Sequence, residues 1–447
     1  MTNILIIGAG RSSGALIDYC LVKAKKMGWR VTVADSDLKA AKEKVGDHAH
    51  AIATWLDVAK ANDRRDLISR SDIVVSLLPA DRHLEVAHDC IRLRKHLITA
   101  SYVSKELYRL GDEARNRELI FMGEMGLDPG VDHMSAMQTI NELRDKGAEI
   151  VAFRSYTGGL VAPEFDNNPW HYKITWNPRN VVLAGQGTAH YLKEGKLRCI
   201  PYNRLFETTT SVNVPNLGEL EMYPNRDSLL YRKTYGLDQI PTLIRGTLRY
   251  PGYCAAWGAL VKIGLTDANF PILMSEGMTY HELMESYAPG TSANGSVKER
   301  IAQLIGERVN SPVMKKLVWL GLFRKKKITI SNATPALILQ DLIEKRWALD
   351  EGDRDMVVMQ HEFDYVLGGK RRRRTSTLVM KGDDKDTAMA KLVGLPLGIF
   401  VRLMSENKIE SRGVTIPIMN EVYEPVLKEL EEYGVQFNEY DEALLTA

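Results

Sequence analysis

A glycine-rich turn close to the N-terminus contains residues suited to binding a dinucleotide. It follows a short apolar run and leads into apolar positions with helical spacing. Gly8 and Gly10 allow the tight turn and the close backbone approach that a pyrophosphate needs. Arg11, Ser12 and Ser13 follow at the helix start, where free N–H groups bind phosphates. Because Ser13 replaces the third glycine of the usual pattern, the motif needs support from its surroundings.

An acidic residue about twenty positions beyond this turn supplies that support. Residues 30–34, "RVTVA", are predicted to form a second strand, which ends in Asp35. Its carboxylate can accept both ribose hydroxyls of NAD, whereas a 2′-phosphate would be repelled. The next residue is Ser36 and not an arginine, so the sequence favours NAD over NADP. The alternative is a packing role for the glycines, with Asp35 capping the following helix.

The elements that position these residues alternate as in an α/β fold. Strands are predicted at residues 71–79, 95–104 and 118–125, continuing the alternation begun by the first β-turn-α unit. This alternation predicts a doubly wound parallel sheet of the Rossmann type.

The ends of these strands carry the next candidate residues, because open α/β sheets bind ligands beyond the carboxyl ends of their strands. Leu77, Leu78 and Pro79 close the first of the three strands and are predicted to flank the dinucleotide. Beyond the other two strand ends lie Ser101, Tyr102, Asp128 and His133. We expect these residues to face the same crevice.

Composition and charge exclude several classes of protein. The 447 residues predict two or three domains. With 59 basic and 57 acidic residues, the formal charge of +2 gives no general attraction to nucleic acid or membranes. The four cysteines lack metal-ligand spacing and suit free thiols in a reducing compartment. We expect no metal site and no nucleic-acid partner.

Targeting and membrane segments are also not expected. The chain enters its first strand without a basic leader, and we expect no run of the ~18 apolar residues that a bilayer span needs. These features predict a cytoplasmic protein with no membrane partner.

Several longer segments together carry a resemblance to a known family. They are "TASYVS", "EMGLDPGVDH", "SYTGGLVAPE", "NNPWHYKITWNPRNVVLAGQG", "YPNRDS", "IRGTLRYPGY" and "GLPLGIFVRL". In type and order they resemble the glutamate-forming saccharopine dehydrogenases, also called saccharopine reductases. The resemblance implies an NAD(P)-dependent oxidation of saccharopine to glutamate and 2-aminoadipate 6-semialdehyde in lysine metabolism. It also implies a Rossmann domain, a second α/β domain that binds substrate and makes a homodimer, and a small helical insertion.

The resemblance further implies roles for individual residues. It places Ser101 and Tyr102 at the substrate and gives Asp128 a role in binding or acid–base chemistry. Thr247, within the segment "IRGTLRYPGY", is a further candidate for substrate binding. Thr157 stands where family members often have a cysteine, so the position keeps a hydrogen-bonding side chain but no thiol. Asp35 is a second departure, because it replaces a basic residue typical of NADP-using relatives.

Four arginines in the middle of the chain could bind the three carboxylates of saccharopine. Arginine binds carboxylates through two parallel hydrogen bonds and keeps its charge when desolvated. Arg179, Arg226, Arg245 and Arg249 lie among aromatic, asparagine or glycine residues and not in a run of mixed charge. Arg226 is the first choice, and a structural salt bridge is the alternative for each of the four.

Proton transfer is assigned to residues at the strand ends. The secondary amine must lose its proton so that its lone pair can form the imine as hydride leaves. Asp128 and Tyr102 are the predicted catalytic residues. For Asp128 a turn in "LDPG" is the structural alternative, and His133 fits an ordinary helix residue better.

The predicted domains are discontinuous. The Rossmann domain is expected at residues 1–128 with about 384–410, and the substrate domain at 129–261 with about 350–383 and 411–447. Amphipathic patterns at about 262–349 predict the helical insertion, in which Trp319 and Trp347 are expected to be core residues. The basic run in "GGKRRRR" is expected to be an exposed turn or a subunit contact.

Two other functions remain open at this point. One is a reductive-amination enzyme similar to carboxynorspermidine dehydrogenase, which would need a pocket lined by acidic residues. The other is a non-catalytic regulatory protein that senses a dinucleotide.

Overall fold

The chain forms two compact units. The structure, a computed structural model, describes residues 1–184 and 186–444. Unit 1 comprises residues 1–148 and 380–437, and unit 2 comprises residues 149–379 and 438–447. Residue 185, within one of the family-like segments, and residues 445–447, at the end of the predicted substrate domain, lie outside the described residues.

Unit 1 is built on a seven-stranded parallel sheet in the order β15-β6-β5-β4-β1-β2-β3. Its strands are β1 (Thr2–Ile7), β2 (Trp29–Asp35), β3 (Ala51–Trp55), β4 (Ile73–Ser76), β5 (His96–Thr99), β6 (Ile120–Met122) and β15 (Gly413–Thr415). Its helices are α1 (Gly14–Met27), α2 (Leu38–Val45), α3 (Ala61–Ser69), α4 (His83–Leu93), α5 (Lys105–Arg109), α6 (Gly111–Asn116), α7 (Val131–Asp145), α15 (Ala388–Ser405) and α16 (Asn420–Glu432). The predicted doubly wound parallel sheet is therefore confirmed.

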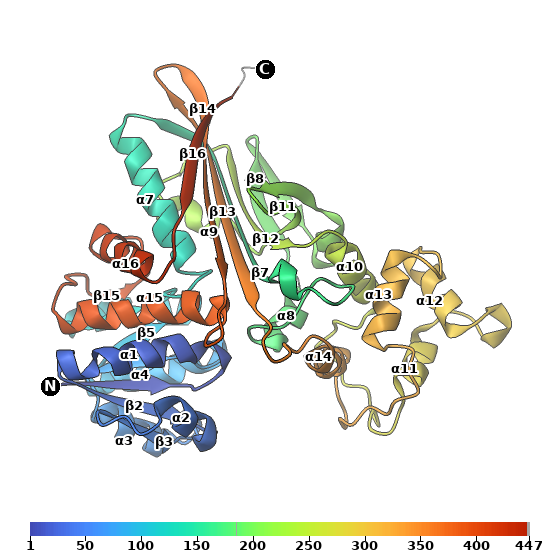
Figure 1. Cartoon of the computed structure of the whole chain (residues 1–447), viewed down its shortest axis with the longest axis horizontal. Helices are drawn as coiled ribbons and strands as arrows, with labels where there is room; N and C mark the ends of the chain where they lie inside the picture. The colour runs from blue at the N-terminus through green and yellow to red at the C-terminus, as the bar shows by residue number, and fades with distance from the viewer. Residues whose placement is uncertain (185, 445–447) are drawn as a thin grey trace. The chain divides into compact units, whose positions relative to one another are not determined.

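Helix α15 packs closely against α1, and glycines make the close approach possible (Figure 1). A Cβ at Gly394 would lie 2.6 Å from the backbone nitrogen of Leu16, and one at Gly398 would lie 2.6 Å from the ring of Tyr19. Among the described residues, α15 alone is long and apolar enough to cross a membrane by length and composition. The expectation of no such run was wrong, but 78% of this segment is buried, as in the core helix of a folded unit.

The boundaries of unit 1 differ from those predicted for the Rossmann domain. Residues 129–148 and 411–437 belong to it, although both were expected in the substrate domain. Strand β15 pairs in parallel with β6 and extends the sheet, while α7 packs on α16. The short strand β15 adds an edge to the sheet through backbone pairing, which apolar periodicity does not reveal.

Unit 2 is built on a mixed sheet in which β7 and β12 are parallel neighbours. The main path runs β10-β11-β12-β7-β13-β14-β16, and β8 and β9 lie off it. The strands are β7 (Glu149–Val161), β8 (Ala189–Lys193), β9 (Lys196–Ile200), β10 (Thr210–Val214), β11 (Gly218–Pro224), β12 (Thr242–Arg249), β13 (Asp355–Leu367), β14 (Lys370–Lys381) and β16 (Asn438–Ala443). The helices are α8 (Pro178–Leu183), α9 (Leu230–Thr234), α10 (Tyr253–Ile263), α11 (Tyr280–Tyr287), α12 (Val297–Ile305), α13 (Pro312–Leu320) and α14 (Pro335–Arg346).

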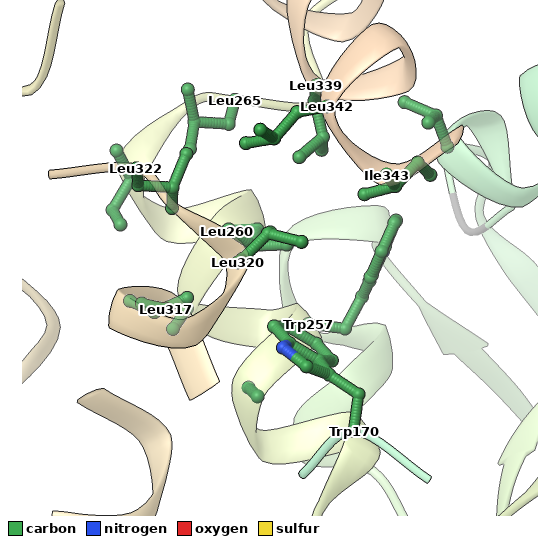
Figure 2. Packing of buried hydrophobic residues seen from close by; sticks show 14 of the residues in the cluster. Trp170, Trp257, Leu260, Leu265, Leu317, Leu320, Leu322, Leu339, Leu342 and Ile343 are labelled. Atoms are coloured by element: carbon green, nitrogen blue, oxygen red, sulfur yellow. The ribbon is translucent and has the colours of Figure 1, made fainter. Parts of the chain in front are cut away.

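The helices of residues 262–349 share a core with the rest of unit 2. Figure 2 shows Trp170 and Trp257 beside leucines from this helical segment. Trp347 is fully buried in this cluster and Trp319 packs on it partly buried, in line with their predicted core roles. The helical segment that was predicted as an insertion therefore groups with unit 2 and shares its core.

The basic run lies on the β13–β14 hairpin. Gly368 and Gly369 form its two-residue turn, and both have positive φ, as a tight hairpin of this length requires. The next three basic residues are exposed, whereas Arg373 pairs with Asp364 at 2.6 Å and Arg374 with Asp441 at 2.8 Å. Two of the five basic side chains thus bind acidic residues within unit 2.

Candidate functional site

The glycine turn of unit 1 fits tightly between strands and is open on its outer side. Gly8 has φ of 113°, and its N–H donates to the Ala34 carbonyl at 2.8 Å. A Cβ at Gly8 would lie only 3.2 Å from the Cβ of Leu77, so a larger residue would be strained there. A Cβ at Gly10 would meet no described atom within 4 Å. The turn therefore leaves the space at Gly10 into which a pyrophosphate could approach the backbone.

Ser13 replaces the third glycine without loosening the turn. It is 1% exposed, and its hydroxyl donates to the Gly10 carbonyl at 2.8 Å. The same carbonyl accepts from the Ser13 N–H at 3.2 Å and from Lys44 Nζ at 2.8 Å. Arg11 is exposed and Ser12 half-buried, at the start of α1. The imperfect motif is thus a well-bonded turn, and Lys44 is a contributor that the sequence did not indicate.

Asp35 is turned toward the glycine turn. Its Oδ2 accepts from the Ala9 N–H at 2.5 Å, and its Oδ1 accepts from the Asp37 N–H at 2.8 Å, with the Ser36 hydroxyl at 3.4 Å. The cap of α2 is Asp37, which accepts from two N–H groups of the first helical turn. The alternative in which Asp35 caps this helix is therefore wrong. Its carboxylate instead lies beside the predicted phosphate site.

Residues 77–79 follow β4 at the same edge of the sheet. The Leu77 N–H donates to the Ile7 carbonyl at 2.8 Å, which ties this loop to the end of β1. Leu77 and Leu78 are half-buried and Pro79 is exposed. These residues lie next to the glycine turn, where the predicted flanking role requires them.

A buried histidine that the sequence did not indicate joins two loops of this edge. His83, at the start of α4, is 5% exposed. Its Nδ1 lies 2.9 Å from Ser76 Oγ, and its Nε2 lies 2.8 Å from Ser101 Oγ and 3.1 Å from Thr99 Oγ1. Burial lowers the pKa of His83 to about 4, against a weaker opposing effect of Asp81. The ring is therefore neutral at neutral pH.

Ser101, Tyr102 and Asp128 come together in unit 1. The Tyr102 hydroxyl donates to Asp128 Oδ1 at 3.0 Å. Glu124, which is 4% exposed with φ of 56°, holds the surrounding loop. Its N–H donates to the Ser101 carbonyl at 3.0 Å, and its Oε1 accepts from the Val103 N–H at 3.1 Å. The side chains of Ser101, Tyr102 and Asp128 thus lie on two loops that Glu124 holds together.

His133 contacts Glu124 and so supports the two loops that carry Ser101, Tyr102 and Asp128. It lies in the first turn of α7, is fully buried, and its Nε2 is 2.8 Å from Glu124 Oε2. The histidine and Glu124 connect α7 to the loop that carries Asp128. Glu124 was not indicated by the sequence, because no spacing distinguishes it from an ordinary loop residue.

In unit 2, three neighbouring strands place polar side chains side by side. Thr247 on β12 is the register partner of both Thr157 on β7 and Tyr223 on β11. Thr157 is 7% exposed, and its Oγ1 has no hydrogen-bond partner among the described residues. Arg245 and Arg249 flank Thr247 at two-residue spacing, so all three lie on the same face of β12.

Arg249 is enclosed by aromatic rings. It is 3% exposed, and its guanidinium carbon lies 5.0, 5.9 and 5.3 Å from the ring centroids of Tyr172, Tyr223 and Tyr253. Its Nη1 donates to the Leu248 carbonyl at 2.7 Å, whereas its Nε has no partner among the described residues. Its cross-strand partner Glu221 accepts from the Cys254 N–H instead. This buried cation forms no ion pair within the described part of the chain.

The other predicted arginines differ in their surroundings. Arg245 is 5% exposed and its guanidinium carbon lies 4.6 Å from the ring centroid of Tyr231. Arg226 is exposed with φ of 49°, just after β11, where the Asn225 N–H donates to the Arg245 carbonyl. Arg179 is half-buried in the first turn of α8. Strand β12 and the loop after β11 therefore bring together Arg226, Arg245 and Arg249, whereas Arg179 lies on α8.

Comparison with family models identifies two consecutive matches. Residues 4–122 match the model described as "Saccharopine dehydrogenase NADP binding domain". Residues 126–435 match the model described as "Saccharopine dehydrogenase C-terminal domain". Together they cover nearly all of the chain.

Curated relatives give the same result over full length. The chain is 34% identical to "Saccharopine dehydrogenase [NADP(+), L-glutamate-forming]" of Pyricularia oryzae, over 98% of each chain. It is 32% identical to the protein of that name from Saccharomyces cerevisiae, again over 98% of each. It is 35% identical to "Alpha-aminoadipic semialdehyde synthase" of Arabidopsis thaliana, over 98% of this chain and 45% of that protein. The chain therefore spans about half the length of the synthases it matches.

A solved structure supports the fold. "Apo histidine-tagged saccharopine dehydrogenase (L-Glu forming) from Saccharomyces cerevisiae" matches with a TM-score of 0.87 and 32% identity, over 99% of this chain and 100% of that one. These findings favour the saccharopine dehydrogenase prediction over the carboxynorspermidine dehydrogenase and regulatory alternatives.

Proposed function

The chain belongs to the saccharopine dehydrogenase family, and on that premise we propose that it oxidises saccharopine to L-glutamate and 2-aminoadipate 6-semialdehyde, or catalyses the reverse reduction. The observation that carries the proposal is the match with enzymes named as L-glutamate-forming over 98% of each chain. The groups of both units fit this chemistry.

Unit 2 supplies the groups suited to the carboxylates of the substrate. Arg249 is a buried guanidinium with an Nε that has no partner among the described residues, which suits it to a carboxylate. Arg226 and Arg245 are further cations near the same strand. Thr157 and Thr247 add hydroxyls between the strands. We assign these five residues to substrate binding.

Unit 1 supplies the groups suited to proton transfer. Asp128 accepts a hydrogen bond from the Tyr102 hydroxyl, so a proton accepted by either oxygen can pass to the other. We assign this pair to removing the proton of the secondary amine and to relaying protons as water adds to the imine. Ser101 is assigned to substrate binding. A bound nicotinamide supplies the acceptor for the hydride that the substrate carbon loses.

The nucleotide is assigned to the glycine turn with a preference for NAD. The family model and the names of the relatives support an NADP-type binding domain. The finer preference rests on Asp35, whose carboxylate beside the turn would repel a 2′-phosphate but accept ribose hydroxyls. Gly8, Gly10, Arg11, Ser12 and Ser13 are assigned to the pyrophosphate, with Ser36, Leu77, Leu78 and Pro79 around the dinucleotide.

Assembly and location are proposed from the family and from the cysteines. We propose a homodimer that acts in the cytoplasm, where the four free cysteines would remain reduced. Light scattering of the purified protein would measure the mass against the 50.3 kDa of one chain. A monomer at working concentration would reject the dimer.

One assay tests the function and the cofactor together. Purified protein is given saccharopine with NAD or NADP at alkaline pH, and glutamate plus the semialdehyde with NADH or NADPH at neutral pH. Turnover of both mixtures is expected, with a higher kcat/KM for NAD. No turnover in either direction would reject the function, whereas a preference for NADP would reject only the role given to Asp35.

A further inference from the structure

His83 connects the two loops that are predicted to face cofactor and substrate in unit 1. It contacts Ser76 at the end of β4 and Ser101 after β5. The ring is buried, with hydroxyls on both of its nitrogen atoms. His83 has no role in the catalytic or binding assignments above. Its bonds nevertheless decide how the hydroxyl of Ser101 is oriented.

The hydrogen bonds of the ring can be counted. A neutral imidazole carries one N–H and one acceptor nitrogen, so its two sides behave oppositely. If Nδ1 carries the proton, Nε2 is an acceptor, and the Ser101 hydroxyl can donate its single proton to His83. If Nε2 carries the proton, it donates to Ser101 Oγ, which at 2.8 Å is nearer than Thr99 Oγ1 at 3.1 Å, and the Ser101 proton remains available for another acceptor. The tautomer of His83 therefore sets Ser101 as a donor or as an acceptor.

The substrate favours one of the two arrangements. A carboxylate only accepts hydrogen bonds, so Ser101 must donate to bind one. Nδ1 must then accept, and the hydroxyl of Ser76 can donate to it. Among the described residues, His83 Nδ1 is the only hydrogen-bond partner of that hydroxyl. The bonds around Ser76 and Ser101 thus fit a ring protonated at Nε2.

We propose that His83 is a positioning residue that carries its proton on Nε2, donates to Ser101 Oγ, and so presents the Ser101 hydroxyl as a donor to a substrate carboxylate. This inference rests on the proposed function, because it concerns recognition of the same acidic substrate. The same reasoning predicts specificity. A ligand that offers an N–H group to Ser101 would need His83 to carry its proton on Nδ1.

Two substitutions at His83 separate donation from packing. In His83→Gln the side-chain amide can replace the Nε2–H donor, whereas in His83→Met a side chain of similar length offers no donor. The saccharopine KM is expected to change less than threefold in His83→Gln and to rise about tenfold to a hundredfold in His83→Met, the range for a hydrogen bond to a charged group. The KM for the nucleotide should stay within twofold in both. Equal saccharopine KM values in the two variants would overturn the proposal.

Coupling to Ser101 and a matched control complete the test. In a Ser101→Ala background, replacing Gln by Met at position 83 should no longer change the saccharopine KM, because the group it acts through is gone. His88→Gln, on the exposed face of α4, is the control and should match the wild type. A persisting effect in the Ser101→Ala background would assign His83 a purely structural role and overturn the inference.

A spectroscopic measurement covers the case in which His83→Met does not fold. Wild-type protein labelled with ¹⁵N-histidine reports by NMR which ring nitrogen of His83 carries the proton, with His83→Gln used for assignment. In the complex with saccharopine the proton should be on Nε2, and a proton on Nδ1 would overturn the proposal. If wild-type protein shows no turnover in the assay above, the proposed function fails before any variant is compared, so the two failures are distinguishable.

Discussion

Two buried arginines, one in each unit, have opposite surroundings. Arg64 in unit 1 is 5% exposed, and its Nε lies 2.7 Å from Asp89 and its Nη1 2.9 Å from Glu85. Arg249 in unit 2 is 3% exposed, but tyrosine rings surround it and no ion pair holds it within the described part of the chain. The first charge is compensated inside the protein. The second has no acidic partner within the described residues, which is the property expected of a group that binds an anion.

The contrast separates structural polar groups from candidate binding groups better than burial does. Buried polar groups are normally hydrogen-bonded, so those with an unused donor or acceptor need an explanation. His83 resembles Arg64, since both ring nitrogens have partners. Thr157 resembles Arg249, since its hydroxyl has no partner among the described residues. We therefore expect changes to the first pair to affect folding or positioning, and changes to the second pair to affect substrate binding.

The largest expected effect is on the compensated charge. Arg64→Met leaves Asp89, which is 3% exposed, with Arg65 as its one remaining cationic partner among the residues that the structure describes. Breaking a buried ion pair costs about 3–5 kcal/mol, so the free energy of unfolding should fall by about 3 kcal/mol. Urea unfolding measures this change. The exposed pair Arg70–Asp66 is the control, and Arg70→Met should cost about 0–1 kcal/mol.

The uncompensated charge should behave in the opposite way. Arg249→Met removes a buried cation that has no carboxylate partner in the described chain, so the free energy of unfolding should change by less than about 1 kcal/mol. The saccharopine KM should rise about a hundredfold, because a charged hydrogen-bonding partner is lost. Arg249→Lys should recover little, since an ammonium cannot form two parallel bonds. Severe unfolding with an unchanged KM would make Arg249 a structural residue like Arg64.

The sequence predicted individual candidate residues but not the side chains that surround them. The glycine turn, Asp35 and the arginines of β12 were predicted because each depends on residue type within a short segment or on family motifs. His83 was missed because Ser76, His83 and Ser101 meet only when β4 and β5 pair in the sheet. The tyrosine rings around Arg249 were missed for the same reason, as Tyr172, Tyr223 and Tyr253 come from separate segments.

The burial of neutral His83 should make the stability of the protein depend on pH. The pKa of His83 is lowered by burial from 6.5 to about 4 in the folded protein, so the unfolded chain binds more protons between these values. The contribution of His83 to stability is complete above pH 6.5 and is lost as the pH falls toward 4. At pH 5 the loss is about 2 kcal/mol.

Urea unfolding at pH 7 and pH 5, for the wild type and for His83→Gln, isolates this contribution. The wild type should lose about 2 kcal/mol more between the two pH values than the variant, because glutamine does not titrate. An identical loss in both proteins would mean that His83 has an ordinary pKa and is not buried as a neutral ring.

The smallest expected effect is at Thr157, whose hydroxyl is expected to serve substrate binding and not stability. Thr157→Val keeps the shape of the side chain and removes a buried hydroxyl that has no partner among the described residues. Stability should be unchanged or rise by up to about 1 kcal/mol, because no hydrogen bond within the protein is lost. The saccharopine KM should rise about fivefold, because one hydrogen bond between neutral groups is lost. Thr157→Cys, which keeps a small side chain with a weak hydrogen-bond donor, should leave the saccharopine KM within threefold of the wild type. A loss of stability in Thr157→Val with an unchanged KM would show that the hydroxyl serves the fold, and would remove Thr157 from the binding groups of unit 2.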